Sequence, residues 1–214
     1  MIYGMNIIVP AAIALVLAYL IGSFPSAYLI ARLRKGIDIR TVGSHNMGAM
    51  NTFYTVGFGW GLLVLFLDMG KGALAVATGW WLTGSVYLQL AAGIVVVLGH
   101  SFPVFLKFRG GKGGATCIGV LAYVMPWGIP LYPAFFGLSL LITRYPTLSY
   151  SIAFLCYPFL AAFVYHSVVY IIFSVVLLLI PFIRYIPRIV EMKQKSGAGG
   201  WKHVAVRRNL KDRL

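Results

Sequence analysis

Charged residues are scarce in this sequence, and acidic residues are almost missing from it. Of its 214 residues, 10% are charged and 60% are hydrophobic, and the mean hydropathy is +0.88. A soluble domain is about one-quarter charged, so the composition argues against a soluble protein and makes lipid the expected solvent. With four acidic residues in the chain, general-base catalysis by Asp or Glu has little to draw on.

Cysteine is rare, and the usual catalytic motifs are missing. Cys117 and Cys156 lie in apolar segments without CxxC or metal-ligand spacing, so we expect inert buried thiols and no disulfide, metal site or cofactor. The sequence contains no Ser/His/Asp arrangement and no HxxxxD box. Any chemistry is therefore expected to rest on charge stabilisation and on the positioning of substrates.

Long apolar blocks make up most of the chain. They cover residues 6–30, 58–82, 86–105, 114–143, 148–164 and 168–183. The first block has no basic segment before it and no clear cleavage site, so we interpret it as a retained membrane span. The fourth block is too long for one span and contains Pro126, Gly128 and Pro130, which predicts two short or partly re-entrant helices.

The basic residues indicate the topology. Lys and Arg total 18, for a formal net charge of +14, and they follow the first, third, fourth and last apolar blocks, whereas connections 83–86 and 165–168 carry none. If the fourth block counts as two segments, every basic loop faces the cytoplasm, as the positive-inside rule requires. We therefore predict an all-α polytopic membrane protein with seven membrane segments, the N-terminus outside and the C-terminus cytoplasmic.

Two regions of different composition divide the chain. Residues 1–190 form the predicted membrane-embedded domain, and residues 191–214 form a basic, Gly-broken cytoplasmic tail. We interpret the tail as a flexible segment on an anionic membrane surface, with docking to a protein partner as the alternative. The positive charge is explained by topology and lipid, so no nucleic-acid partner is expected.

The first polar stretch that could carry chemistry is DIRTVGSHNMGAMN, residues 38–51. Its glycines permit a tight path on which backbone N–H groups converge on an anion, and its side chains add donors and fixed positive charge. The residues concerned are Arg40, Gly43, Ser44, Asn46, Gly48 and Asn51. An ordinary turn between two helices is the alternative, because Gly, Ser and Asn dominate loops.

The second stretch places two charges inside an apolar block. Asp68 and Lys71 are three residues apart and therefore lie on one helix face. Charges within a membrane segment are costly and usually face a protein interior or a wet cavity. The pair is either a self-neutralising structural pair or a ligand-binding element, and in both cases it should face a polar site.

The third stretch, GHSFPVFLKFRGGKGGAT, covers residues 99–116. It sets Arg109 and Lys112 among four glycines directly before an apolar helix, where backbone donors, the helix dipole and an ammonium group can meet. This arrangement predicts a phosphate-binding site. A basic turn that obeys the positive-inside rule is the alternative, but such a turn does not need four glycines. His100 lies close to this motif in sequence.

Together these segments resemble the bacterial acyl-phosphate:glycerol-3-phosphate acyltransferases, which are seven-segment enzymes of the bacterial inner (cytoplasmic) membrane. The resemblance rests on GSFPSAYLIARL, DIRTVGSHNMGAMN, DMGKG and GHSFPVFLKFRGGKGGAT, in that order, up to Thr116. It implies transfer of a fatty acyl group from acyl phosphate to glycerol 3-phosphate, which gives lysophosphatidic acid without acyl-CoA or a cofactor, with the acyl chain among helices and membrane lipids.

The resemblance also implies the roles of individual residues. Ser44, His100 and Lys112 would form the catalytic group. The substrates would be bound by Arg40, Gly43, Asn46, Gly48, Asn51, Asp68, Lys71, Gly110, Gly111, Gly113 and Thr116. Phosphate is a good leaving group whose oxygens could accept the proton of the attacking hydroxyl, which would explain why no protein base is evident.

The chain departs from the family pattern at several positions. His45 and Met50 interrupt the usual GSGNxGATN, Tyr54 stands where the family usually has Arg, and Tyr185 and Arg188 stand where a late His-x-x-Asn pair is usual. These departures concern the acceptor rather than the acyl phosphate. The alternative function is therefore a catalytically degenerate homologue that serves as a structural or lipid-binding subunit of a larger membrane complex.

Overall fold

A computed structural model describes residues 7–144 and 146–195 of the chain. Within these ranges all regular secondary structure is helical, as the sequence predicts. The chain forms two compact units that meet in sequence between Val124 and Met125. Each unit has its own helix packing, and the polar motifs singled out above all belong to the first unit.

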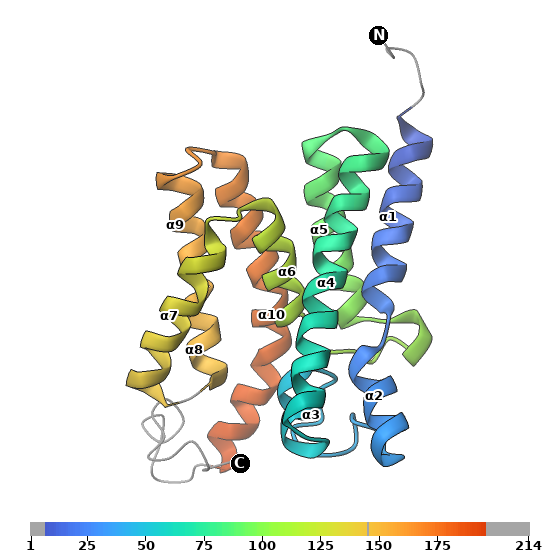
Figure 1. Cartoon of the computed structure of the whole chain (residues 1–214), viewed down its shortest axis with the longest axis vertical. Helices are drawn as coiled ribbons and strands as arrows, with labels where there is room; N and C mark the ends of the chain where they lie inside the picture. Colours follow the sequence, from blue (N-terminus) through green and yellow to red (C-terminus); the bar gives the residue numbers. More distant parts are fainter. Residues whose placement is uncertain (1–6, 145, 196–214) are drawn as a thin grey trace. The chain divides into compact units, whose positions relative to one another are not determined.

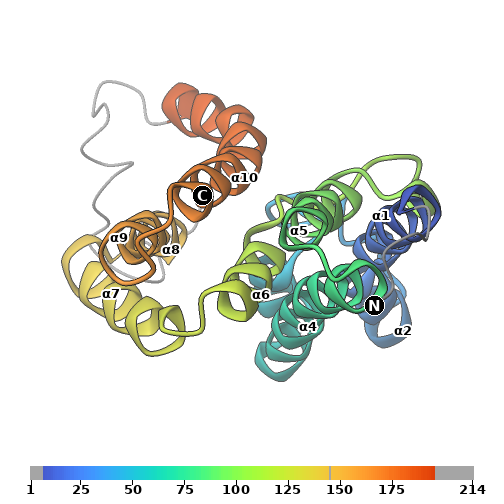
Figure 2. The ribbon, with the colours of Figure 1, turned by 90° about the horizontal axis from the view of Figure 1, so that it is seen from above.

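The first unit is a small bundle of membrane-type helices (Figures 1 and 2). Its elements are α1 (Ile8–Ser23), α2 (Ser26–Lys35), α3 (Ala49–Thr55), α4 (Phe58–Thr83), α5 (Val86–Ser101), η1 (Val104–Leu106) and α6 (Gly114–Val124). Helix α1 packs against α4 and α5, and α4 also packs against α6 and the short α3. The loops that carry the first and third motifs therefore belong to one bundle.

The second unit contains helices of very different length. They are α7 (Gly128–Thr143), α8 (Pro146–Ala153), α9 (Cys156–Phe163) and α10 (Val168–Lys195). Helix α7 packs against α8 and α9, and α9 packs against α10. The apolar block predicted over 148–164 is present as the stretch Leu148–Phe163, but it is broken into α8 and α9. Pro158 has no N–H for the Phe154 carbonyl, which instead accepts from Tyr157 N at 3.1 Å.

Small residues bring the helices of the first unit close together. A Cβ added to Gly22 would overlap the Val96 carbonyl on α5, and one added to Gly119 would overlap the Met69 carbonyl on α4. Such close approach of backbones is how membrane helices gain packing energy when lipid is as apolar as the side chains. The large apolar side chains left exposed, such as Phe66, Leu141 and Ile172, suit a lipid surrounding.

Prolines mark two helix breaks in the first part of the chain. The break expected near Pro126 is confirmed, since α6 ends at Val124 and α7 starts at Gly128. The first apolar block contains a further break, at Phe24 and Pro25 between α1 and α2, although Ile8–Lys35 as a whole is long and apolar enough for the predicted span. Proline cannot donate the backbone hydrogen bond that would continue α1, so the carbonyls of the last turn of α1 become available to other donors.

Four helical stretches are long and apolar enough to cross a membrane. They are Ile8–Lys35, Phe58–Thr83, Val86–Leu106 and Val168–Pro187, and three shorter apolar stretches cover Gly114–Val124, Gly128–Thr143 and Leu148–Phe163. The described part of the chain is thus an array of apolar helices, in agreement with the predicted fold class. The basic tail, predicted to lie on an anionic membrane surface with docking to a partner as the alternative, falls mainly on residues 196–214, which lie outside the described residues.

Candidate active site

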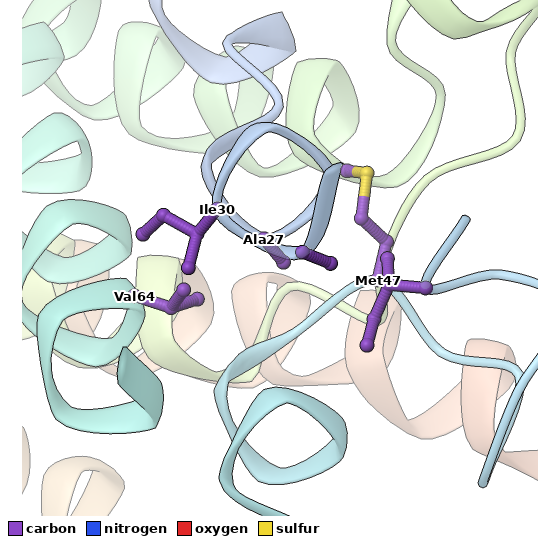
Figure 3. Close-up of a cluster of buried hydrophobic side chains, with 6 residues drawn as sticks. Ala27, Ile30, Met47 and Val64 are labelled. Carbon is purple, nitrogen blue, oxygen red and sulfur yellow. The ribbon is translucent and has the colours of Figure 1, made fainter. Parts of the chain in front are cut away.

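The first motif forms the loop between α2 and α3, and this loop is anchored in the core. Met47 and Ile39 are 1% and 0% exposed and pack in one cluster with Ala27 and Ile30 of α2 and Val64 of α4. Figure 3 shows the Met47 side chain beside Ala27 of α2. Burial of two large side chains at this position holds the intervening polar residues in place.

Asn51 organises the loop through its side-chain amide. Its Oδ1 accepts from Ser44 N at 3.0 Å, and its Nδ2 lies 2.9–3.0 Å from the carbonyls of Ile39, Val42 and Asn46. Gly43 has φ +62°, and a Cβ there would overlap Asn51 Oδ1. Asn51 is 2% exposed and holds the loop together through these hydrogen bonds, while its predicted contact with substrate stays a prediction.

Ser44 and Asn46 differ from Asn51 in having uncommitted side chains. Within the described residues, neither the Ser44 hydroxyl nor the Asn46 carboxamide makes a hydrogen bond, and both residues are half-buried. The residue between them, His45, has φ +56° and contacts the Arg40 carbonyl through Nδ1 at 3.3 Å. The loop therefore presents two free polar side chains at one bend.

The third motif uses some of its backbone donors internally. Gly110 N donates to Ser101 O at 3.2 Å, and Gly111 N donates to His100 O at 3.1 Å. In this structure the two amides are thus used within the protein, and the predicted part of both glycines in substrate binding stays a prediction. Gly113, at φ +89°, leads into α6, and its carbonyl accepts the helical bond from Cys117 N at 2.8 Å.

The start of α6 retains donors for a ligand. The first helical bond comes from Cys117, so the amides of residues 114–116 precede the first intrahelical donor. Thr116 Oγ1 is fully buried and has no hydrogen-bond partner within the described part of the chain. Lys112, half-buried, lies two residues before the helix. Helix N-terminal amides and a lysine are a suitable combination for an anion.

The loops of the first and third motifs meet at Gly111. A Cβ added to Gly111 would overlap both the Met47 carbonyl and the His100 imidazole, so all three are in close contact. A second link comes from Arg40, whose Nη1 donates to Leu106 O at 3.2 Å. The prediction that the two Gly-rich loops approach each other is confirmed, whereas anion binding between them stays a prediction.

Arg40 is engaged mainly by protein groups. It binds both Asp38 oxygens, with Nη2 to Oδ2 at 2.7 Å, and its guanidinium lies 5.2 Å from the centre of the Tyr28 ring. The hydrogen-bonded Arg40 guanidinium lowers the pKa of Asp38, and the carboxylate in turn raises the pKa of Arg40. Asp38 offsets the charge of Arg40, which links the two loops, and the predicted contact of Arg40 with substrate stays a prediction.

The second motif forms a buried polar cluster between helices. Lys71 Nζ lies 2.7 Å from Asp68 Oδ1 and donates to Phe24 O at 3.2 Å, and His100 Nδ1 lies 3.8 Å from the same Asp68 oxygen. Asp68 is 1% exposed and Lys71 7%. The cluster thus reaches, through His100, the point at which the two loops meet.

Ser26, which the sequence analysis did not single out, completes this cluster. Its Oγ donates to Asp68 Oδ1, and the residue is 2% exposed. Pro25, at the helix break, is the one available signal. No three His, Cys, Asp or Glu side chains gather to hold a metal in residues 7–144 and 146–195.

Two positions at which the chain departs from the family pattern lie in α10. Tyr185 lines an apolar cavity of about 350 Å³ with residues of α8, α9 and α10, such as Tyr150, Pro158 and Leu179. The side chain of Arg188 lies outside the described residues. A contribution of these positions to acceptor binding therefore stays a prediction.

Comparisons with known proteins identify the family of this chain. A family model described as glycerol-3-phosphate acyltransferase matches residues 12–195. Glycerol-3-phosphate acyltransferase 2 of Dehalococcoides mccartyi (strain ATCC BAA-2266 / KCTC 15142 / 195) is 52% identical over 210 residues, covering 98% of this chain and 100% of the relative. The glycerol-3-phosphate acyltransferase of Bacillus subtilis (strain 168) is 44% identical over 138 residues, which are 64% of this chain and 71% of the relative.

Solved structures agree as well. The crystal structure of PlsY, an integral membrane glycerol 3-phosphate acyltransferase, in its glycerol 3-phosphate form is 31% identical, with a TM-score of 0.79 over 86% of this chain and 92% of that one. Its lysophosphatidic acid form gives 30% identity, a TM-score of 0.77 and the same coverage. The chain is thus an all-helical, multi-pass membrane protein, and it belongs to the glycerol-3-phosphate acyltransferase family.

Proposed function

We propose that this protein transfers a fatty acyl group from acyl phosphate to glycerol 3-phosphate and so produces lysophosphatidic acid. The observation that carries the proposal is the meeting of two Gly-rich, donor-bearing loops over a buried Asp68–Lys71–His100 cluster in a member of this family. Both substrates carry phosphate, which such a donor-rich, basic site is suited to bind. No observation favours the alternative of a degenerate subunit.

The contacts separate ligand-binding from scaffolding residues. Ser44, Asn46, Lys112 and the N-terminal amides of α6 would contact phosphate. The side chains of Ser44 and Asn46 make no hydrogen bond within the described residues, the α6 amides precede the first helical bond, and Lys112 brings a positive charge two residues before this helix. Lys71 has three N–H groups, of which two are used by Asp68 and Phe24. The scaffold consists of Arg40, Gly43, Gly48, Asn51, Gly110, Gly111 and Gly113.

The reaction can proceed by positioning and charge stabilisation. A glycerol hydroxyl oxygen attacks the acyl carbonyl carbon, the bond from that carbon to the phosphate oxygen breaks, and the hydroxyl proton passes to the released phosphate. Lys112, the α6 amides and the Ser44 hydroxyl would stabilise the negative charge on the carbonyl oxygen and on the leaving phosphate. His100, held between the Asp68 cluster and Gly111, would orient the acceptor at the junction of the loops.

The proposed setting is the bacterial inner membrane, with seven segments, an outside N-terminus and a cytoplasmic C-terminus. Four long and three shorter apolar helical stretches support this number, although α6 alone, with 11 residues, would extend only about 16 Å. Cysteines introduced as Thr41→Cys and Lys195→Cys should react with a membrane-impermeant maleimide from the same side. Labelling from opposite sides would contradict the topology; the native Cys117 and Cys156 are buried and should give little background.

The activity is tested with purified protein in phospholipid vesicles. Labelled glycerol 3-phosphate and an acyl phosphate should yield labelled lysophosphatidic acid, whereas acyl-CoA in place of acyl phosphate should yield none. Lys112→Ala should lower kcat/KM roughly 10- to 100-fold, because it removes a charged hydrogen-bond donor from a partly shielded site.

Lys107→Ala is the matched control for this substitution. Lys107 is an exposed lysine of the same loop, five positions before Lys112, so its removal takes away the same charge from outside the site. It should leave kcat/KM within about twofold of the wild type. Equal losses for both variants would show that the loop acts only through its net charge and would contradict a specific phosphate contact by Lys112.

A further inference from the structure

The helix break at Phe24 and Pro25 supplies two groups to the buried cluster on α4. The Phe24 carbonyl accepts a hydrogen bond from Lys71 Nζ at 3.2 Å. Ser26, the first residue of α2, donates a hydrogen bond from its hydroxyl group to Asp68. An uninterrupted α1 would use that carbonyl within the helix. The break therefore creates anchors for both members of the Asp68–Lys71 pair.

The Asp68 carboxylate is bound asymmetrically. Its Oδ1 receives both the Ser26 hydroxyl and the Lys71 ammonium, while its Oδ2 has no hydrogen-bond partner among the described residues although it is buried. A buried carboxylate with one unpartnered oxygen has little else to fix its rotation. His100 Nδ1 also faces Oδ1, but at 3.8 Å it is too far for a hydrogen bond. Besides Lys71 itself, the Ser26 hydrogen bond is therefore the hydrogen bond that directs this oxygen toward the ammonium.

We infer that Ser26 is a positioning residue of the active site. Its hydroxyl group holds the Asp68 carboxylate in place, so that Lys71 keeps one N–H directed to substrate. This inference rests on the proposed function and adds to it a residue of the α1–α2 break. Lys71 has one N–H left after binding Asp68 and Phe24 O, and that donor can be aimed only if the other two bonds hold their geometry.

Loss of the Ser26 hydroxyl should affect catalysis more than substrate binding. Ser44, Asn46 and Lys112 would still hold the phosphates in Ser26→Ala, so the apparent KM for glycerol 3-phosphate should stay within about twofold. The misdirected Lys71 donor should lower kcat roughly tenfold, as expected for an interaction that reaches full strength in the transition state. Ser26→Thr keeps the hydroxyl and should recover most of kcat.

Ser23 provides a matched control on the preceding turn. It is 0% exposed, and its Oγ lies 3.5 Å from the Gly99 carbonyl, so Ser23→Ala also removes a buried hydroxyl but leaves the charged cluster intact. Ser23→Ala should keep kcat within about twofold. Thermal unfolding of both alanine variants in the same detergent should show whether each one is folded.

The test compares initial rates of acyl transfer by the wild type and the variants Ser26→Ala, Ser26→Thr and Ser23→Ala in vesicles. A folded Ser26→Ala with wild-type kcat overturns the inference alone, as does a Ser26→Thr no better than Ser26→Ala. If Ser26→Ala does not fold, the inference is tested by Ser26→Thr, which keeps the hydroxyl group. A folded Ser26→Thr with a tenfold lower kcat than the wild type would contradict the role of the hydroxyl. A wild-type chain without acyl transfer overturns the proposed function and this inference with it.

Discussion

The contact at Gly111 offers a sharp test of how the two loops form one site. In Gly111→Ala the added methyl group would occupy space now filled by the His100 ring and the Met47 carbonyl. Neither neighbour has free space to enter, because His100 is 3% exposed and Met47 is 1% exposed and packed in the α2–α4 core. The third motif must therefore move away from the first.

The size of the effect follows from this geometry. Overpacking of a buried contact costs about 1–3 kcal/mol, which should appear as a lower free energy of unfolding. A displacement of about 1 Å between groups that bind reacting atoms can cost on the order of 100-fold in rate. Lys112 follows Gly111 directly and should move with it, so we expect Gly111→Ala to lower kcat/KM for glycerol 3-phosphate on the order of 100-fold.

Initial rates in vesicles measure this loss, and helical circular dichroism together with thermal unfolding shows whether the variant is folded. Gly70→Ala is the control: Gly70 is adjacent to Lys71 in sequence, but a Cβ there would meet nothing within 4 Å. It should keep both activity and stability. A folded Gly111→Ala with kcat/KM within about twofold of the wild type would refute the reasoning that contact between the loops sets the site.

Three further predictions concern the first motif. His45→Gly should raise the free energy of unfolding by up to about 1 kcal/mol, because residue 45 has φ +56°; a loss in thermal unfolding would contradict this. Asn51→Asp should lower both stability and activity, because it replaces an amide that donates to three carbonyls with an acceptor. Ser44→Ala should lower activity alone. Equal melting temperatures for the two variants would contradict the division between a scaffold residue and a ligand contact. Arg40 lowers the pKa of Asp38, so the ionised carboxylate stabilises the fold at any pH above its unfolded pKa of about 3.9. This stabilisation is lost as the pH falls from about 3.9 through the lower pKa of the folded state. The difference in melting temperature between the wild type and Asp38→Asn should therefore be present at pH 7 and should shrink as the pH falls below about 4.

Much of the site could be predicted because its residues are grouped in short motifs. Glycine, Ser, Asn and Lys in two loops at the ends of apolar blocks indicated an anion site, and the α6–α7 break followed from the prolines near residue 126. What the sequence could not provide was the direction of each side chain. Asn46 and Asn51 are the same residue type five positions apart, yet one is uncommitted and the other makes four hydrogen bonds within the loop.

Contacts between distant segments were also beyond the sequence. Ser26 and Asp68 are separated by 42 positions, and an apolar run with one proline gave no reason to expect a hydroxyl bound to a buried carboxylate. The breaks inside the apolar blocks over 6–30 and 148–164 were not predicted, for a related reason. Hydropathy shows that a segment is apolar, but whether a proline ends a helix depends on which neighbours satisfy the freed carbonyls.

The acidic residues of the first unit explain how a strongly basic chain could confine its phosphate affinity to one place. Asp38 is bound to Arg40 and Asp68 to Lys71, so two cations near the loops are offset by carboxylates and fix the scaffold in place. The proposed phosphate contacts then fall mainly to neutral donors, which recognise an anion by geometry at short range, and to Lys112. Activity should therefore respond far more to the arrangement of the loops than to the net charge of the surface. For this reason substitutions at Gly111 and Ser26, which carry no charge, are expected to lower acyl-transfer activity more than a substitution at the exposed Lys107.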